Sequence, residues 1–152
     1  MKYTDYDIVF QEIPDETTLA INISNCPHRC PSCHSPQLQQ DIGEELTCEV
    51  IDALLKKYSG TTCVLFMGGD ASPDEVAALA GYIKQKYSGE VRTAVYSGNS
   101  EFPRVNSVFD YIKLGEWREE CGTLRQTTTN QRLYRITSDG EPIDITSMFW
   151  KK

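Results

Sequence analysis

The sequence has no long apolar run and no excess of positive charge. No apolar segment approaches the roughly 20 residues that a membrane-spanning helix needs, and residues 1–5 do not resemble the start of a signal peptide. Lys and Arg total 15 against 22 Asp and Glu, a net charge of −7, whereas a nucleic-acid surface concentrates basic side chains. We therefore expect a cytoplasmic protein that binds neither membranes nor nucleic acid.

Chain length and composition predict one globular domain. The 152 residues match the size of one ordinary domain, and 39% apolar with 24% charged residues is typical of soluble folds. The chain contains no internal repeat, low-complexity tract or linker. Residues 1–152 are therefore interpreted as a single domain.

Strand and helix patterns alternate through the middle of the chain. Apolar residues at helical spacing predict helices over 47–58 and 73–87, the second starting with a Ser72-x-x-Glu75 capping box. Strand-like segments lie at 6–10, 18–24, 63–67, 91–96, 111–114, 133–136 and 143–145. This order predicts an α/β fold with either an open, mostly parallel sheet or a partial (βα) barrel, followed by a C-terminal hairpin.

Three of the six cysteines lie close together. Cys26, Cys30 and Cys33 follow the predicted strand 18–24 at spacings of four and three, among prolines that block a regular helix. In a reducing compartment such thiols serve as ligands more often than as disulfide partners. Three thiolates are an incomplete set for tetrahedral zinc or for a cubic iron–sulfur cluster, so the fourth ligand decides the function.

Several groups are candidates for the fourth position. His34 would complete a structural zinc site, although the adjacent Cys33 and His34 reach one metal with difficulty in tetrahedral geometry. Cys48, Cys63 or Cys121 would complete an all-cysteine iron–sulfur site, although Cys48 and Cys63 fit an apolar interior better. A cluster held by three thiolates leaves one iron open to a substrate.

The spacing Cys26-x3-Cys30-x2-Cys33 after an N-terminal strand resembles the signature of radical S-adenosylmethionine (SAM) enzymes. In these enzymes three cysteines ligate a 4Fe-4S cluster, and the amino and carboxylate groups of SAM chelate the fourth iron. The resemblance implies that the three cysteines are the metal ligands and that the cofactors are a 4Fe-4S cluster and SAM.

Further residues fit the same resemblance. Gly68, Gly69 and Asp70 follow a predicted strand and resemble the motif that binds the SAM ammonium group, since glycines permit close backbone approach and a carboxylate pairs with an amine. The resemblance also implies that His34 packs near the adenine and that Ser97 contacts the ribose or methionine moiety. All five residues are therefore candidates for cofactor binding.

Within that superfamily, four segments are similar to the activating enzymes of anaerobic, class III ribonucleoside-triphosphate reductases: 26–36, 67–70, 111–115 and 129–136. The resemblance implies reductive cleavage of SAM to a 5′-deoxyadenosyl radical that installs a glycyl radical on the reductase. It also implies a low-potential electron donor such as flavodoxin.

Three other functions remain open on the sequence alone. A radical SAM enzyme that acts on a small molecule would need no protein partner. An activase of a different, formate-lyase-like glycyl radical enzyme would carry the same signature. A non-enzymatic zinc-binding module would use the same cysteines. The sequence also predicts a loop over one face at 116–131, which is a candidate cover for a partner-binding opening, and a solvated side chain at Lys113.

Overall fold

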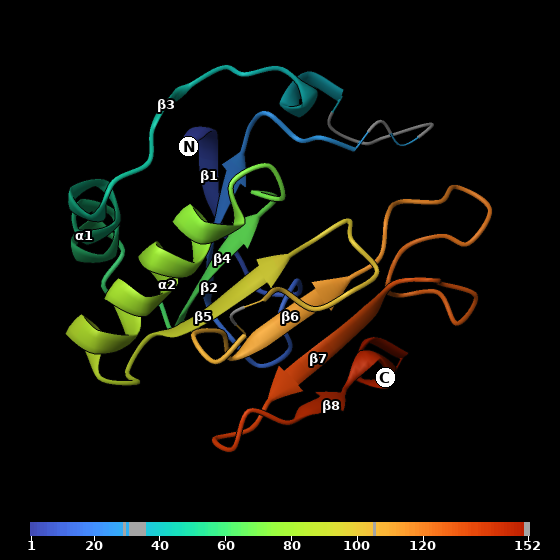
Figure 1. Cartoon of the computed structure of the whole chain (residues 1–152). Coiled ribbons are helices and arrows are strands. Elements are labelled where there is room, and N and C mark those ends of the chain that lie inside the picture. The colour runs from blue at the N-terminus through green and yellow to red at the C-terminus, as the bar shows by residue number, and fades with distance from the viewer. Residues whose placement is uncertain (29, 31–35, 105, 151–152) are drawn as a thin grey trace.

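The computed structural model describes residues 1–28, 30, 36–104 and 106–150. Within these ranges eight strands form one sheet in the order β3-β1-β2-β4-β5-β6-β7-β8 (Figure 1). Two α-helices and two short 3₁₀ helices accompany the sheet. The elements are β1 (Lys2–Val9), β2 (Thr18–Ile23), η1 (Pro36–Gln39), β3 (Glu44–Glu45), α1 (Cys48–Lys57), β4 (Cys63–Met67), α2 (Pro73–Tyr87), β5 (Arg92–Tyr96), β6 (Tyr111–Leu114), β7 (Arg132–Ile136), β8 (Pro142–Asp144) and η2 (Thr146–Trp150).

The sheet is open and mixed. Strands β2, β4, β5 and β6 run parallel, whereas β1 and β3 on one side and β7 and β8 on the other pair antiparallel. The predicted α/β class and the C-terminal hairpin are confirmed. The prediction of a mostly parallel sheet was wrong for the flanks, because short connections such as that between β1 and β2 join antiparallel neighbours. The alternative of a partial barrel is not confirmed for the described residues.

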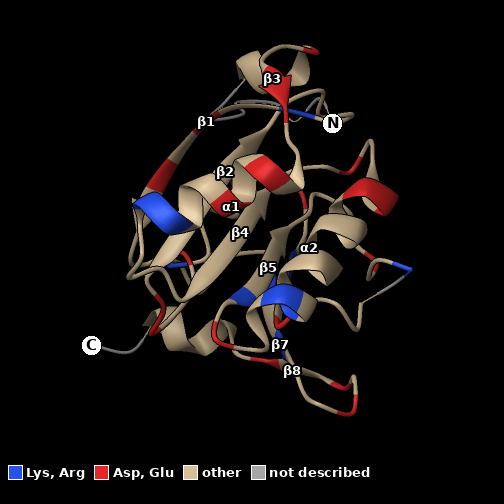
Figure 2. Ribbon diagram, turned by 90° about the vertical axis from the view of Figure 1, so that its left-hand side faces the viewer, with Lys and Arg blue, Asp and Glu red and all other residues tan. Residues whose placement is uncertain are grey.

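Both α-helices pack on the same face of the sheet (Figure 1). Thr47 caps α1, where its side chain accepts a hydrogen bond from the Val50 amide at 3.2 Å. Each helix carries at least one acidic residue in its first turn and two lysines in its last turn, an order that suits the helix dipole (Figure 2). The predicted helices agree with the observed ones to within one residue at each end.

The start of α2 differs from the predicted capping box. The Ser72 side chain makes no cap hydrogen bond, and Glu75 turns to the N-terminal ammonium of Met1, with an O–N distance of 2.7 Å. Glu45 also contacts this ammonium, at 3.2 Å. The hydrogen bond with Glu75 is the main reason that the pKa of the amine is raised. The Glu75 side chain, which the local pattern assigned to the capping box, therefore forms an ion pair with a residue distant in sequence.

Apolar side chains cover both faces of the sheet. On one face Ile21, Phe66 and Val95 belong to a buried cluster with apolar side chains of both helices. On the other face Leu65 and Leu133 belong to a smaller buried cluster. Because successive side chains of a strand point to opposite faces, each central strand contributes to both clusters. Within the described ranges no helix is long and apolar enough to cross a membrane.

The two helices are also joined by a polar cluster. Asp52 of α1 accepts hydrogen bonds from the Tyr82 and Tyr87 hydroxyls of α2 at 2.5 and 2.7 Å, and Lys86 lies 2.8 Å from the same carboxylate. Desolvation by burial tends to raise the pKa of Asp52, but the bonds from Lys86, Tyr82 and Tyr87 outweigh it and lower the pKa to about 2. The ionised carboxylate therefore stabilises the contact between the helices.

We expect Asp52→Asn to lower the free energy of unfolding at neutral pH. A carboxylate whose pKa falls from 3.8 to about 2 on folding contributes stability that is present above 3.8 and is lost as the pH falls through about 2. The difference in the free energy of unfolding between variant and wild type should therefore shrink as the pH falls from 3.8 to about 2. Urea denaturation across a pH series measures it, with the exposed Glu90→Gln as control. A difference that stays constant down to the lowest pH would contradict this account.

Candidate metal and cofactor site

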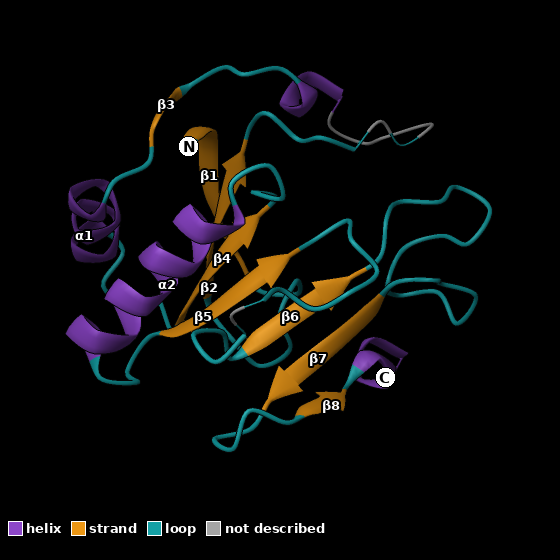
Figure 3. Cartoon of the chain, viewed as in Figure 1, coloured by secondary structure: helices purple, strands orange, loops and turns teal. Residues whose placement is uncertain are grey.

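The carboxyl ends of the four parallel strands meet at one edge of the sheet (Figure 3). The cysteine segment, residues 26–34, begins shortly after β2. Gly68-Gly69-Asp70 follows β4 directly, and Ser97-Gly98 follows β5 directly. Three sequence-predicted parts of the site, which are far apart along the chain, therefore start from the same edge of the sheet, as parallel α/β folds arrange their ligand sites.

One row of side chains crosses the sheet near this edge. The strand register pairs Asn22 with Met67, Met67 with Tyr96, and Tyr96 with Lys113. Residues that are directly paired point to the same face, which is the face opposite the helices because Met67 and Tyr96 pack against the smaller cluster. This row forms the floor of a pocket.

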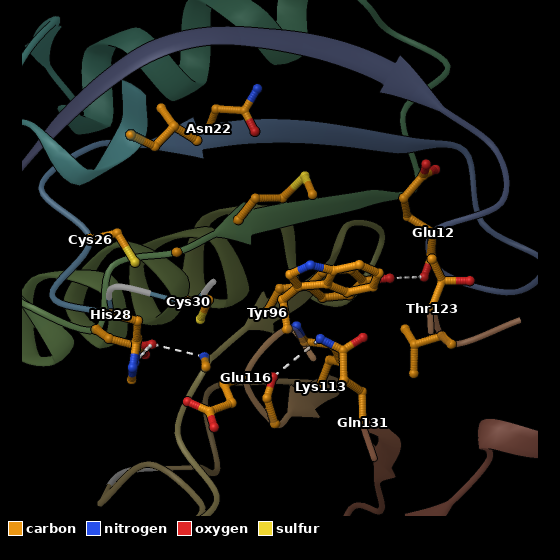
Figure 4. A pocket seen from close by; sticks show the side chains of 18 of the residues that line it. Glu12, Asn22, Cys26, His28, Cys30, Tyr96, Lys113, Glu116, Thr123 and Gln131 are labelled. Carbon is orange, nitrogen blue, oxygen red and sulfur yellow. Dashed lines mark hydrogen bonds and ion pairs between the residues drawn. The ribbon is translucent and has the colours of Figure 1, made fainter. Parts of the chain in front are cut away.

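The pocket has a volume of about 430 Å³, within the range of small-molecule sites. Cys26, Cys30 and His28 lie on one side of it, and Glu12 and Thr123 lie on the far side (Figure 4). Gly68, Asp70 and Gly98 add to its lining. Of the predicted cofactor residues, Gly69 and Ser97 are not among the lining residues. Cys33 and His34 lie outside the described residues, so their predicted roles stay predictions.

Two backbone hydrogen bonds fix the base of the cysteine segment. The amide of Asn25 donates to the Gln40 carbonyl and the amide of Cys26 donates to the Leu38 carbonyl, both at 2.8 Å. Asn25 has a φ of +60°, a left-handed conformation that asparagine tolerates better than most residues. The chain therefore turns sharply out of β2 and places Cys26 and Cys30, both half-buried, on the pocket.

The other cysteines lie elsewhere. Cys63 starts β4 opposite Thr18, four residues or about 13 Å from the end of that strand, and burial raises the pKa of its thiol. Cys48 starts α1, is partly buried and also has a pKa raised mainly by burial. Cys121 is in the loop 116–131 and does not line the pocket. Interior packing is thus confirmed for Cys63 and only partly for Cys48. Within the described part of the chain, no three His, Cys, Asp or Glu side chains form a metal site.

Asp70 is the centre of the polar contacts at this edge. Its Oδ1 accepts the Ser97 hydroxyl at 2.7 Å, and its Oδ2 accepts the Gly98 amide at 2.9 Å and His28 Nε2 at 2.8 Å. The Asp70 side chain is 9% exposed. Ser97 therefore supports the site by orienting Asp70 from behind the pocket wall.

Both glycines before Asp70 have a backbone conformation that other residues rarely adopt. Gly68 has φ +113° and Gly69 has φ +95°. A Cβ on Gly69 would also lie 2.4 Å from Cγ2 of Val76, so this glycine lets α2 pack against the turn. Gly68 alone of the two faces the pocket.

Lys113 is buried in the pocket, so the prediction of a solvated lysine was wrong. Only 9% of the residue is exposed, and its Nζ lies 4.9 Å from the centroid of the Tyr96 ring. Among the described residues it has no ion-pair partner within 4.0 Å. The local sequence around Lys113 predicts an exposed side chain at the end of a strand. The pairing of β6 with β5 instead places this side chain on the face of the sheet that lines the pocket.

Burial lowers the pKa of Lys113 to about 8. The charges of Asp70, Cys30 and Cys26 oppose this effect, which places the ammonium within electrostatic range of the cysteine segment. The pocket therefore contains one buried cation and one buried carboxylate that do not pair directly with each other.

The loop 116–131 covers part of the pocket, as predicted, and forms no helix or strand among its described residues. Arg125 donates a hydrogen bond to the side chain of Gln11, in the connection between β1 and β2. Trp150 of η2 donates from Nε1 to the Leu124 carbonyl at 2.9 Å. These contacts tie the loop to two other parts of the chain.

His28, Tyr96 and Lys113 are among the pocket residues that the sequence analysis missed as site residues. His28 stands between two predicted ligands, and this position was the signal that could have identified it. Tyr96 is the last residue of β5 and Lys113 is the penultimate residue of β6, and only the strand register shows that both lie on the face of Met67.

Comparison with models of protein families matches residues 17–111 to the 4Fe-4S single cluster domain. The match covers more than half of the chain and contains the cysteine segment and Gly68-Gly69-Asp70. No curated protein and no solved structure matched in the two other comparisons. The chain therefore belongs to the family of 4Fe-4S single-cluster domains.

Proposed function

We propose that Cys26, Cys30 and Cys33 hold a 4Fe-4S cluster whose fourth iron binds SAM. Membership of the 4Fe-4S single-cluster family supports the cluster. The position of Cys26 and Cys30 on a pocket, with Cys48 and Cys63 placed away from it, supports a set of three thiolates. An iron left without a protein ligand would face a cavity large enough for a small molecule.

Two of the charged groups that line the pocket, Lys113 and Asp70, carry the proposal of SAM as the ligand. The α-amino acid end of SAM is a zwitterion, and the pocket offers the Lys113 ammonium to its carboxylate and the Asp70 carboxylate to its amine. Asp70 Oδ1 accepts only the Ser97 hydroxyl among the described residues, which leaves room for a further donor. A buried unpaired lysine is costly without a ligand, so an anionic partner fits this site.

The proposed reaction is the activation of an anaerobic ribonucleoside-triphosphate reductase. When bound, the cluster and SAM would supply the chemistry: one electron passed through the cluster would cleave SAM to methionine and a 5′-deoxyadenosyl radical, which would take a hydrogen atom from a glycine Cα of the reductase. The chain orients SAM through Lys113 and Asp70, and the backbone of Gly68 lets it approach closely. The loop 116–131 shields the site from water.

The remaining assignments follow the same proposal. His34 would pack near the adenine, while Gly69 and Ser97 act by shaping the Gly-Gly-Asp turn and holding Asp70. The reductase is proposed as the protein partner, and a flavodoxin-like protein as the electron donor. The far side of the pocket, near Glu12 and Thr123, is where a glycine-bearing loop would enter.

Substitution of each proposed ligand tests the cluster. We expect Cys26→Ala, Cys30→Ala and Cys33→Ala to prevent assembly of a stable 4Fe-4S cluster during anaerobic reconstitution, as measured by iron and sulfide content and visible absorbance. Cys48→Ala and Cys121→Ala are matched controls that should load fully. A full iron content in any of the first three variants would contradict the assignment. Zinc in place of iron in the anaerobically purified protein would favour the non-enzymatic zinc-binding module.

Lys113→Met tests the binding of SAM. A hydrogen bond to a charged group contributes about 1.5–3 kcal/mol, so the Kd of SAM should rise by about 10- to 100-fold. Isothermal titration of the reconstituted protein measures the affinity, and the exposed Lys56→Met should bind as wild type does. Equal affinity of the Lys113 variant and the wild type would remove this lysine from the SAM site.

The protein partner is identified by assaying the activation reaction. We expect reconstituted protein, SAM and a low-potential reductant to produce a glycyl radical signal in electron paramagnetic resonance when the anaerobic reductase is added. A formate-lyase-like enzyme is the control partner. A radical signal with that enzyme alone would transfer the activity to the alternative activase, and deoxyadenosine formation with neither protein would point to a small-molecule substrate.

A further inference from the structure

His28 joins the cysteine segment to the sheet. It stands two residues after Cys26 and two before Cys30, and its Nε2 lies 2.8 Å from Asp70 Oδ2. The His28 side chain is 22% exposed and that of Asp70 is 9% exposed, so the contact is largely shielded from water. Together with the backbone bonds at Asn25 and Cys26, this hydrogen bond ties the described part of the segment to the rest of the chain.

The acceptor of this bond is held rigidly. The Ser97 hydroxyl and the Gly98 amide fix the two oxygens of Asp70 at 2.7 and 2.9 Å. Asp70 follows β4 and Ser97 follows β5, so both lie at the ends of two central strands. His28 therefore docks on a carboxylate whose orientation is set by the sheet, independently of the cysteine segment.

Gly98 forms a slot for the imidazole ring. A Cβ added to Gly98 would lie 2.8 Å from His28 Cδ2 and 3.0 Å from Nε2, which is closer than an ordinary van der Waals contact. Its backbone is not in the left-handed region, so the absence of a side chain serves the ring and not the turn. The ring is thus positioned by a bond on one side and by close packing on the other.

We propose that His28 is a positioning residue of the iron–sulfur centre. Its imidazole docks the stretch from Cys26 to Cys30 on Asp70 and Gly98, and thereby fixes these two thiols relative to the ends of β4 and β5 before the cluster is assembled. Pre-organised ligands hold a metal centre more firmly than ligands on a free loop. The inference rests on the cysteines as cluster ligands and is independent of SAM.

Two substitutions on different elements should give the same result. His28→Ala removes the ring, and Gly98→Ala leaves His28 and Asp70 intact but fills the slot. In both variants, reconstituted anaerobically as the full chain, iron should be lost to a ferrous chelator about 10-fold faster than in wild type, the scale of other supporting-residue substitutions. The reduction potential and the paramagnetic resonance spectrum of the cluster should shift in the same direction in both.

Two further variants separate positioning from other roles. His28→Gln keeps a donor at a similar reach to Asp70 and should restore much of the wild-type rate of iron loss. Asn99→Ala alters an exposed neighbour of Gly98 and should behave as wild type. Thermal unfolding of the cluster-free proteins is compared in parallel, since His28→Ala and Gly98→Ala should change the cluster properties more than the fold.

Three results would overturn the proposal. Wild-type iron loss and spectra in His28→Ala and Gly98→Ala would show that the contact has no effect on the centre. Losses that merely follow reduced thermal stability would make the contact a general packing feature. Hyperfine coupling from ¹⁵N-labelled histidine that disappears in His28→Ala would make His28 a direct ligand. None of these measurements needs SAM, so their outcome is separable from that of the activase proposal.

Discussion

The parallel alignment of β2, β4, β5 and β6 is the constraint on which the site depends. Parallel neighbours end at the same edge, so the segments that follow them meet although they are far apart along the chain. The same alignment sets the register that places Asn22, Met67, Tyr96 and Lys113 in one row. The antiparallel strands at both flanks extend the sheet and leave this edge intact.

The two charged groups Asp70 and Lys113 differ in how many partners the protein gives them. The Asp70 carboxylate receives three hydrogen bonds, from Ser97, Gly98 and His28, which offset the cost of its burial. Lys113 has an aromatic ring beside it and no ion pair within the described part of the chain. The carboxylate is therefore a built part of the wall, whereas the lysine is the group that a bound anion would complete. The proposed zwitterionic ligand would use both groups, and the same carboxylate joins His28 of the cysteine segment to the sheet.

Local patterns predicted the elements well where the physical cause is local. The apolar spacing of residues 47–58 and the Thr47 cap sufficed to predict α1, since a helix is formed by contacts within a few residues. The capping box of Ser72 and Glu75 failed because the Met1 ammonium, distant in sequence, competes for the same carboxylate. The prediction that Lys113 is solvated failed for a similar reason, since pairing with Tyr96 and Leu133 decides on which face of the sheet its side chain lies.

The sequence by itself determined the cysteine spacing, the Gly68-Gly69-Asp70 turn and the order of the two α-helices and of every strand except β3, because each depends on residue types a few positions apart. Only the tertiary structure decided that the sheet is mixed and open, that Asp70 is joined to His28, and that Lys113 is buried beside the cysteine segment. These features depend on strand register and on contacts between distant segments. Such contacts have no signal at any fixed spacing along the chain, since they arise only when the strands have paired.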